Sequence, residues 1–390
     1  MRIAYLIPDP GIPIGGTKGA SVHVASLTEA LVRLGAEVSI FAPKIEGEPK
    51  LEADIINIDL GNFKKGLAGE MDRIEKLTHF YEEVEVYMKN HRFDAIYERL
   101  SLFAGGGELE QRLDLPRVVE VNAPVTKERM EHFGLANVEV ALGKEYEALK
   151  DATVVCVSKP LATWAVSRGA KSSKSIPNGA DVDVFSPERW YATRDRLRES
   201  LGLTGKVVLG FIGSLKPWHG VETIFDAVEH LSYKDQIAIL VVGDGPLRSR
   251  VNQRIEDLQG RIPTIAVGAV DRKTVPAYLS AIDIALAPYL PTEEFYFSPL
   301  KIVEAMAAGK PFIASDFPPI REIGGTAGVY FPAGDSMSLA NEIDRLARSK
   351  PLRKYLAQQV RTLACSSHDW TNVASATLEV LRSEEASRAA

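Results

Sequence analysis

Short apolar runs without alternation recur along the first half of the chain. The first spans Ile3 to Ile7, and others span Glu37 to Ala42, Ala95 to Tyr97 and Arg117 to Val121. Strands of a parallel sheet that is covered on both faces have this continuous apolar character. Between the first two runs, apolar residues repeat at helical spacing from Val24 to Leu34. The order of strand, loop, helix and strand predicts βαβ units, and therefore an α/β fold.

The same pattern starts again in the second half. Apolar runs span Val207 to Ile212, Ile237 to Val242, Thr264 to Val270 and Ile284 to Tyr289. A chain of 390 residues is long for a single hydrophobic core. Charged residues are frequent up to Arg198, between the two sets of runs. We therefore predict two domains, residues 1–190 and 191–368, followed by a C-terminal helix over 369–390.

The stretch from Tyr296 to Ser315 predicts a helix followed by a buried strand. Ser298 is a favourable N-cap residue, and Pro299 suits the first helical position, where a missing N–H has no cost. Gly309 favours termination of the helix, and the apolar run after it is typical of a buried strand.

The start of this helix predicts an anion site. The backbone N–H groups of Ser298, Leu300 and Lys301 have no preceding turn to bond to, and the helix dipole adds positive potential. Lys301 lies where that dipole disfavours a cation, and Glu304 follows one turn later. Two interpretations stay open. Lys301 and Glu304 form a solvated pair, or Lys301 binds a phosphate while Glu304 accepts hydrogen bonds from a neighbouring sugar, which indicates a nucleotide-diphosphate ligand.

Two further segments join this stretch in a recognisable order. Pro177 to Asp181 spells P-N-G-x-D, and Gly243 to Pro246 spells G-D-G-P. With the A-M-A-x-G-x-P run from Ala305, these segments resemble the signature of glycosyltransferase family 4, whose group 1 members are retaining enzymes of the GT-B fold. The resemblance spans nearly the whole chain. It implies two Rossmann-like domains whose parallel sheets face an interdomain cleft, with a C-terminal helix that crosses back to the first domain.

The resemblance also implies roles in a donor site. Glu304 matches the glutamate that holds the ribose, and Gly268 and Val270 lie at the strand end beside the nucleotide base. Tyr296 stands where the family usually has a second glutamate, which touches the donor sugar. Glu293 or Glu294 would substitute for that glutamate only if the preceding loop bends inward. The departure at Tyr296 leaves the sugar open.

A second departure lies after the strand that ends at Ile212. Family members usually place an arginine and a lysine there, five positions apart, to bind the donor diphosphate, whereas this chain has Ser214 and His219. Lys216 lies between them. We expect Lys216 and Lys301 to share the phosphate contacts, with more of the affinity coming from the helix terminus because a bidentate arginine is missing.

In the first half, the resemblance places the Gly15-Gly16 loop at the cleft, and a plain tight turn is the alternative. Glu120 and Asn122 match positions where many relatives carry a histidine of the cleft. For Glu120 an internal ion pair with Arg99 is an equal alternative to a catalytic role. Lys18 and His23 are weaker candidates, and His23 also suits a surface position near the start of a helix.

Several other classes are disfavoured. Gly15, Gly16 and Gly19 do not form G-x-G-x-x-G, so a nicotinamide enzyme is not expected. Asp181 and Asp183 spell D-x-D, but they lie in the passage between the domains, and we expect no metal site. A net charge of −6 argues against nucleic acid and against strong adhesion to anionic membranes. The basic-apolar segment 63–67 is interpreted as a solvated face, with at most weak peripheral membrane contact.

The setting is predicted to be cytoplasmic. Cys156 and Cys365 have no ligand spacing, and both are expected to be buried thiols. The opening residues are too short an apolar run for a signal peptide, and no window is long enough for a membrane span.

The sequence therefore predicts a retaining, metal-independent glycosyltransferase that uses a nucleotide-diphosphate sugar, with a UDP-sugar favoured. The acceptor is a small molecule, a glycan or a lipid-linked hydroxyl, and the oligomeric state stays open. Two alternatives remain. One is a non-catalytic subunit that binds nucleotide sugars, suggested by the changes at Tyr296, Ser214 and His219. The other is an epimerase or phosphorylase of the same fold.

Overall fold

The computed structural model describes residues 1–64, 66–258 and 260–389, with 66–68 and 389 described by their backbone alone. The chain forms two compact units, each with its own sheet. The first consists of Met1–Pro177 joined by Trp370–Ala390, and the second is Asn178–Asp369. Each unit is described separately below.

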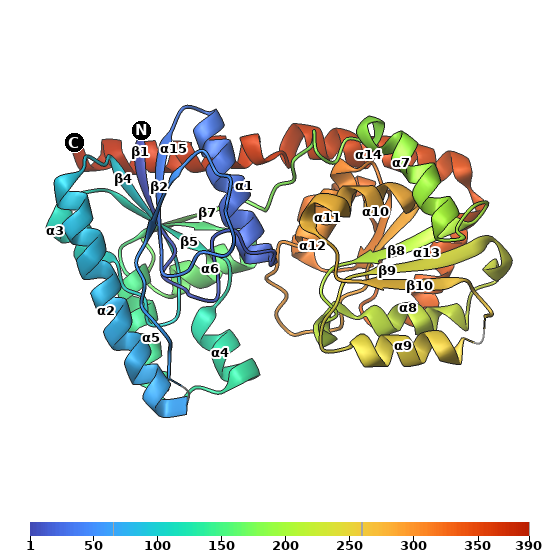
Figure 1. Cartoon of the computed structure of the whole chain (residues 1–390), viewed down its shortest axis with the longest axis horizontal. Helices are drawn as coiled ribbons and strands as arrows, with labels where there is room; N and C mark the ends of the chain where they lie inside the picture. Colours follow the sequence, from blue (N-terminus) through green and yellow to red (C-terminus); the bar gives the residue numbers. More distant parts are fainter. Residues whose placement is uncertain (65, 259, 390) are drawn as a thin grey trace. The chain divides into compact units, whose positions relative to one another are not determined.

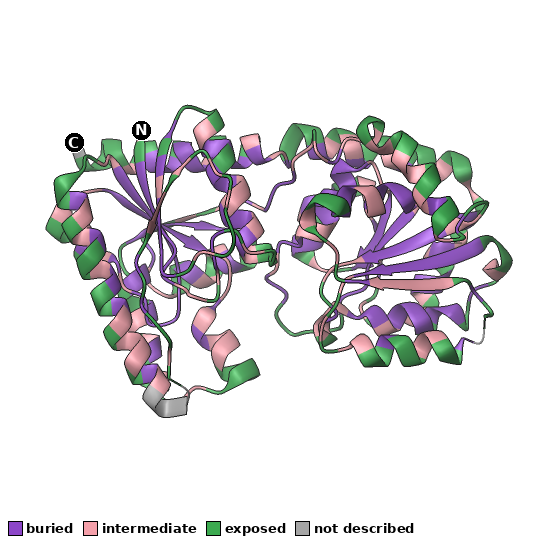
Figure 2. Ribbon diagram, in the orientation of Figure 1, coloured by how far each residue is buried: buried purple, intermediate pink, exposed green. Residues whose placement is uncertain are grey.

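The first unit is built on a parallel sheet in the order β3-β2-β1-β4-β5-β6-β7. Tyr5 lies at its centre, in register with Ile40 of one neighbouring strand and Tyr97 of the other. The central strands are buried on both faces, as their unalternated sequences predict (Figure 2). The strands span β1 Arg2–Leu6, β2 Glu37–Ala42, β3 Asp54–Asn57, β4 Ala95–Arg99, β5 Arg117–Val121, β6 Thr153–Cys156 and β7 Ser172–Ser175.

Helices cover both faces of this sheet (Figure 1). The predicted C-terminal helix is α15, which packs against α1 and against β5. Ser158 caps α6, because its hydroxyl accepts a hydrogen bond from the Leu161 N–H at 3.5 Å. The helices span α1 Gly19–Arg33, α2 Gly66–Asn90, α3 Gly107–Leu113, α4 Val125–Phe133, α5 Val138–Leu149, α6 Lys159–Ser167 and α15 Trp370–Ala389.

The second unit repeats the design with a parallel sheet in the order β10-β9-β8-β11-β12-β13. Strand order reverses between β8 and β11, and open α/β sheets bind ligands at the carboxyl ends of strands at such a reversal. The strands span β8 Val207–Ile212, β9 Ile237–Val242, β10 Thr264–Gly268, β11 Ile284–Ala287, β12 Phe312–Ser315 and β13 Val329–Phe331. The helix predicted before β12 follows β11 along the chain. Its start therefore lies on the side of the sheet where the strands reach their carboxyl ends.

That helix is α11, Leu300–Ala307. The other α-helices of the unit are α7 Pro187–Ser200, α8 Val221–Val228, α9 Arg248–Asp257, α10 Val275–Ala281, α12 Pro318–Gly324, α13 Ser336–Arg348 and α14 Lys350–Ser367. Short 3₁₀ turns are η1 Pro217–His219, η2 Lys234–Gln236, η3 Arg272–Thr274 and η4 Gly325–Ala327. Pro318 and Pro319 form the first turn of α12, because proline is well tolerated at helix starts.

The predicted boundary near residue 190 falls inside α7, whereas the second unit starts at Asn178. Two contacts explain the earlier start. Ala180 donates its N–H to the His368 carbonyl at 2.8 Å, and α7 packs on α10. The P-N-G-x-D passage is thus part of the second unit, and the return to the first unit follows Asp369.

Two smaller expectations also differ. Cys156 is a buried thiol, but Cys365 is exposed, because it lies on the solvent side of α14. Within the segment 63–67, residue 65 and the side chains of 66 and 67 lie outside the described residues. The Phe63 ring is covered by the Lys76 ammonium at 4.6 Å from its centroid.

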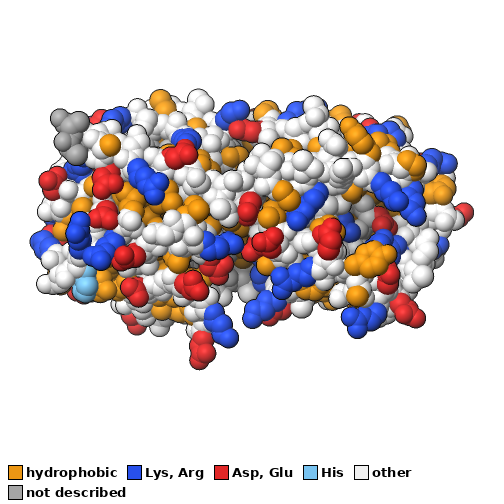
Figure 3. Space-filling model, turned by 90° about the horizontal axis from the view of Figure 1, so that it is seen from above, with side chains coloured by type: hydrophobic (Ala, Val, Ile, Leu, Met, Phe, Trp, Pro, Cys, Tyr) orange, Lys and Arg blue, Asp and Glu red, His pale blue; other side chains and the backbone are white. Residues whose placement is uncertain are grey.

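On the face shown in Figure 3, Lys and Arg side chains are interspersed with Asp and Glu. No extended patch of one sign covers that face. Among the helices in the described part of the chain, none is long and apolar enough to cross a membrane.

Candidate active site

The start of α11 is held by the P-N-G-x-D passage. The Ser298 hydroxyl accepts from the Asn178 N–H at 2.9 Å, and the Asn178 side-chain amide donates to the Ser298 carbonyl at 2.7 Å. The prediction of Ser298 as N-cap is therefore wrong: its hydroxyl is engaged, and Pro299 occupies the cap position. Leu300 and Lys301 become the first two helical residues, with N–H groups that have no preceding turn to bond to.

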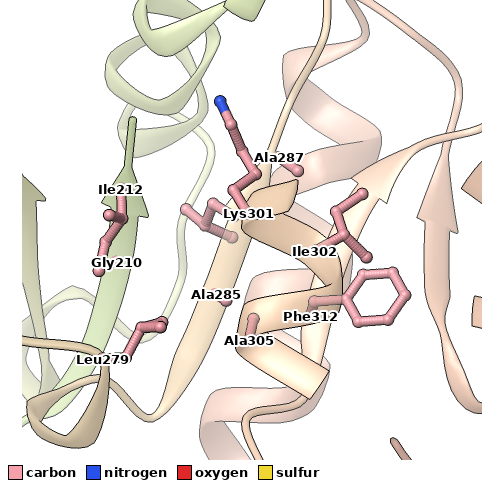
Figure 4. A pocket seen from close by; sticks show the side chains of 10 residues that line it. Gly210, Ile212, Leu279, Ala285, Ala287, Lys301, Ile302, Ala305 and Phe312 are labelled. Carbon is pink, nitrogen blue, oxygen red and sulfur yellow. The ribbon is translucent and has the colours of Figure 1, made fainter. Parts of the chain in front are cut away.

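Lys301 is positioned to meet an anion. Its ammonium is shielded from solvent and has no hydrogen-bond partner among the described atoms. It lies over two aromatic rings, 4.4 Å from the Phe211 centroid and 5.1 Å from that of Tyr289. Figure 4 shows it extending from α11 away from the apolar side chains of Ala305 and Phe312. Burial lowers the pKa of Lys301 to about 7, although the nearby Glu304 carboxylate raises it.

The loop after β8 brings His219 to the same place. The His219 ring meets Tyr289 edge-on, with centroids 5.4 Å apart. Its Nδ1 lies 2.6 Å from the Ser214 carbonyl oxygen, which can only accept, so Nδ1 carries the proton and Nε2 is an acceptor. Burial, together with the charges of Lys301 and Lys216, lowers the pKa of His219 to about 3. His219 is therefore neutral at physiological pH.

Lys216 is the second cation of this loop. It is half-buried, with its ammonium 5.6 Å from the Trp218 ring centroid. Ser214 is exposed, and its hydroxyl is 3.4 Å from His219 Nδ1. The structure thus brings Lys301, distant in sequence, to the loop that carries Ser214, Lys216 and His219, and both Lys301 and His219 lie against Tyr289.

Two glycines allow these loops to approach each other. A Cβ on Gly243, in the G-D-G-P turn, would lie 1.9 Å from the Gly213 carbonyl oxygen. A Cβ on Gly220 would lie 1.8 Å from the Pro288 carbonyl oxygen. Both glycines have positive φ, 137° and 65° respectively, so a side chain there is excluded twice over. The G-D-G-P turn therefore holds the backbone of the loop that follows β8, at Gly213.

Glu304 is not on an exposed helix face, as the solvated-pair interpretation requires. It is buried, with 5% of its surface exposed, and it accepts a hydrogen bond from Arg272. The predicted solvated pair with Lys301 is therefore absent. Arg272 was not among the predicted site residues. Its only signal in the sequence is its place just after the Gly268 to Val270 strand end, where β10 stops at Gly268.

The segment before α11 is an aromatic cluster. Phe295 stacks on Phe317 with ring centroids 4.3 Å apart, and Tyr296 packs on Phe297 at 4.4 Å. Tyr296 is only 9% exposed. Glu293 and Glu294 are both exposed, so neither is folded inward to replace the missing carboxylate.

In the first unit, Glu120 is the centre of a buried network. It accepts from the Tyr5 hydroxyl at 2.9 Å and from Arg99 at 3.0 Å, and it also bonds His23 Nε2. Burial raises the pKa of Glu120, but the charges of His23 and Arg99 outweigh it and lower it to about 2. The internal ion pair left open from the sequence is thus present. His23 is buried against Trp370 rather than on the surface.

Asn122 and the Gly15-Gly16 loop lie in the same unit. The Asn122 side-chain N–H₂ is buried and has no partner among the described atoms. Gly15 has φ +88°, and a Cβ there would lie 2.2 Å from the Glu46 carbonyl oxygen. The tight-turn alternative therefore accounts for Gly15, while Asn122 has a donor free to meet a ligand.

In the D-x-D sequence, the Asp181 carboxylate accepts hydrogen bonds from nearby backbone N–H groups. Asp181 Oδ1 accepts from the Asp183 N–H at 3.1 Å and from the Val184 N–H at 2.8 Å. In the described ranges, no three His, Cys, Asp or Glu side chains gather as metal ligands. Metal independence stays a prediction.

Two family models match the chain. Residues 17–184 match the model described as Glycosyltransferase Family 4, and residues 206–349 match Glycosyl transferases group 1. The chain belongs to the family 4, group 1 glycosyltransferases. The predicted family and enzyme class are confirmed.

Relatives agree with this family. The glycosyltransferase is 32% identical over 234 residues to phosphatidyl-myo-inositol mannosyltransferase of Mycobacterium leprae, a match that covers 58% of each chain. It is 25% identical over 397 residues to D-inositol 3-phosphate glycosyltransferase of Xylanimonas cellulosilytica, covering 94% of this chain and 92% of that one.

Solved structures confirm the fold of this glycosyltransferase as GT-B. Sucrose-phosphate synthase of Thermosynechococcus elongatus superposes with a TM-score of 0.76 at 23% identity, covering 99% of both chains. Anabaena HepE, solved in complex with UDP, has a TM-score of 0.73 at 20% identity, covering 98% of this chain and all of that one.

Proposed function

We propose that this glycosyltransferase moves a sugar from a nucleoside-diphosphate sugar, with UDP as the nucleotide, to an acceptor hydroxyl, with retention at the sugar carbon. It acts in the cytoplasm and without a metal ion. The observation that carries the proposal is the unpaired Lys301 ammonium beside the first turn of α11. A buried cation without a partner is costly, and a diphosphate would neutralise it.

The chemistry follows from this charge. As the bond between sugar and diphosphate breaks, negative charge grows on the leaving phosphate oxygens. Lys301, Lys216 and the N–H groups at the start of α11 are in place to stabilise that charge. In this proposal these groups take over the role of the arginine and lysine that family members usually carry after β8. His219 is neutral and offers Nε2 as an acceptor, which suits a hydroxyl of the donor better than a phosphate.

The ribose is assigned to Glu304 and Arg272. Glu304 has a second carboxylate oxygen that can accept from a ribose hydroxyl while Arg272 holds the first. HepE was solved with UDP and with UDP-glucose, which supports uridine as the base. The names of the inositol relatives suggest an inositol phosphate or phosphoinositide as the acceptor to try first.

The test is a transfer assay. The protein is incubated with UDP- and GDP-sugars and with myo-inositol 3-phosphate, phosphatidylinositol or simple glycans, in the presence of EDTA. We expect release of the nucleoside diphosphate and a product heavier by one sugar in an intact-mass spectrum. The anomeric configuration of that product, measured by NMR, tests retention.

A non-catalytic binding subunit would give a different result in this assay. Nucleotide binding measured by calorimetry, with no transfer to any acceptor, would favour a binding subunit. Transfer that disappears with EDTA and returns with a divalent cation would refute metal independence.

A further inference from the structure

A pocket lies at the end of α11 opposite to Lys301. It has a volume of about 110 Å³ and is lined by α7, α10 and the turn that follows α11, through Ala308 and Lys310. Eight helical residues separate it from the start of α11. At 1.5 Å per residue this is roughly 12 Å. The pocket is therefore separate from the start of α11, although Arg272, the partner of Glu304, lies 5.5 Å from the ring centroid of Phe185 in its lining.

One wall of the pocket is aromatic. Trp190 donates its ring N–H to the Val184 carbonyl at 2.7 Å, so its polar edge is satisfied and its ring is left as an apolar surface. Phe185 and Pro187 continue this surface, and Tyr191, 68% exposed, forms the rim. A flat apolar group would fit against these rings.

The lining also carries two cations, Arg194 on α7, one turn after Trp190, and Lys310 after α11. Lys310 donates one hydrogen bond, to the Ser280 carbonyl at 2.8 Å, and an ammonium has three donors. Arg194 pairs with Asp283 at 3.1 Å through Nη2, while its Nε is buried and has no partner among the described atoms. Donors on both residues are thus left over at the pocket.

The two cations share a nearby carboxylate. Asp283 is the carboxylate that faces these cations, and it also pairs with Arg198 at 2.9 Å and accepts from the Val208 N–H at 2.9 Å. One carboxylate therefore serves Arg194, Arg198 and Lys310. Burial and the positive charge of Arg194 lower the pKa of Lys310 to about 7, as expected for an ammonium without a full counter-charge.

We propose that this pocket is a second ligand site that takes a small organic anion. A carboxylate or phosphate group binds Lys310 and Arg194, and a flat apolar body packs against Trp190 and Tyr191. A purely structural role for Lys310, in which it caps the end of α10, accounts for its bond to Ser280. It does not account for the free donor on Arg194 or for the open aromatic wall.

The experiment is isothermal titration of the full chain with three probes: benzoate, phenyl phosphate and the neutral benzyl alcohol. We expect the acids to bind and the alcohol to bind at least tenfold more weakly. The stronger of the two acids identifies whether the anion is a carboxylate or a phosphate. Lys310→Met should weaken acid binding about tenfold or more, as loss of a charge-assisted hydrogen bond does, and Lys310→Arg should restore most of it.

Three further variants separate the outcomes. Lys354→Met removes an exposed lysine of α14 and should leave binding unchanged. Measured with excess UDP so that the proposed donor site is occupied, Lys301→Met should also leave binding to this pocket unchanged. Tyr191→Ala, at an exposed position that does not endanger folding, should weaken binding several-fold. Equal binding of benzyl alcohol, or a loss in Lys301→Met but not in Lys310→Met, would overturn the proposal.

Discussion

Lys301 and His219 lie against the same Tyr289 ring but differ in charge at neutral pH. His219, with its pKa lowered to about 3, stays neutral, while Lys301, lowered to about 7, is close to half protonated. A diphosphate favours the ammonium form of Lys301, so binding takes up a proton when the pH exceeds 7. The protonation state of Lys301 thus gives the proposed donor site a charge that changes near neutral pH.

The first prediction is a pH dependence of donor binding. Between pH 7 and 9 we expect the Kd for UDP to rise with pH, by up to about tenfold per unit, because a growing fraction of Lys301 must first be protonated. Calorimetry in buffers of different ionisation enthalpy would measure the proton uptake. Lys301→Met should bind weakly with a flat profile. An unchanged slope in that variant would show that another group titrates.

Tyr296 replaces the glutamate that, by the family resemblance, is expected to contact the donor sugar. An aromatic ring cannot accept hydrogen bonds from two sugar hydroxyls as a carboxylate does, and the surrounding stretch from Phe297 to Gly309 is intact. The Tyr296 side chain is 9% exposed and packs on Phe297. We infer that the wild-type site favours deoxygenated or amino-substituted sugars.

The second prediction follows from this inference. Tyr296→Glu should shift the ratio of specificity constants toward fully hydroxylated hexose donors, even if the overall rate falls. A competition assay with paired hydroxylated and deoxygenated donors measures the ratio directly. Tyr296→Phe serves as the control and should keep the wild-type preference. If Tyr296→Glu leaves the ratio unchanged, Tyr296 points away from the sugar.

At the scale of the element, α11 depends on a segment 120 positions away in sequence. Ser298 and Asn178 join the helix start to the P-N-G-x-D passage through hydrogen bonds of 2.9 and 2.7 Å, across a separation of 120 residues. This pairing explains why the two motifs occur together. It also means that the orientation of the anion site is set by the passage as well as by the helix.

The third prediction concerns this pairing. Ser298→Ala leaves the buried Asn178 N–H without its hydroxyl partner, which costs about 1–3 kcal/mol of folding free energy. It should also raise the donor KM, since the first turn of α11 loses its support. Ser280→Ala is the matched control, because Ser280 is equally buried, at 7% exposure, and its hydroxyl donates to the Ala277 carbonyl of its own helix. A similar KM in both variants would mean that the pairing is structural alone.

The elements themselves were largely predictable, because unalternated apolar runs and helix-ending glycines are local signals. The site was predictable only in part. Lys301, Lys216 and His219 were predicted from motifs, and their roles stay predictions, but the Arg272 partner of Glu304 and the His23 partner of Glu120 arise from contacts between distant segments. Ser298 was misassigned for the same reason, since its hydroxyl is taken by Asn178. Local sequence shows which groups are polar, not which of them meet.

At the scale of the whole molecule, the chain closes on its first unit. Residues 178–369 form the second unit, and α15 then returns to pack on α1 and β5. Trp370, Ala374 and Leu381 of this helix are buried in the core of the first unit. The first unit is therefore incomplete until the last residues of the chain are in place.

The fourth prediction tests whether the two units unfold separately. Leu381 in α15 and Leu346 in α13 are both fully buried, at 0% exposure, but they belong to different units. Replacing either leucine by alanine should cost about 2–5 kcal/mol. Leu381→Ala should lower the urea midpoint of the first unit alone, and Leu346→Ala that of the second alone. Tryptophan fluorescence resolves them, because Trp164 and Trp370 lie in the first unit and Trp190 and Trp218 in the second. Replacing both tryptophans of one unit by phenylalanine leaves a protein whose fluorescence reports on the other unit alone. If both urea midpoints fall together in both variants, the two units unfold as one cooperative body. In that case α15 stabilises the whole chain and not the first unit alone.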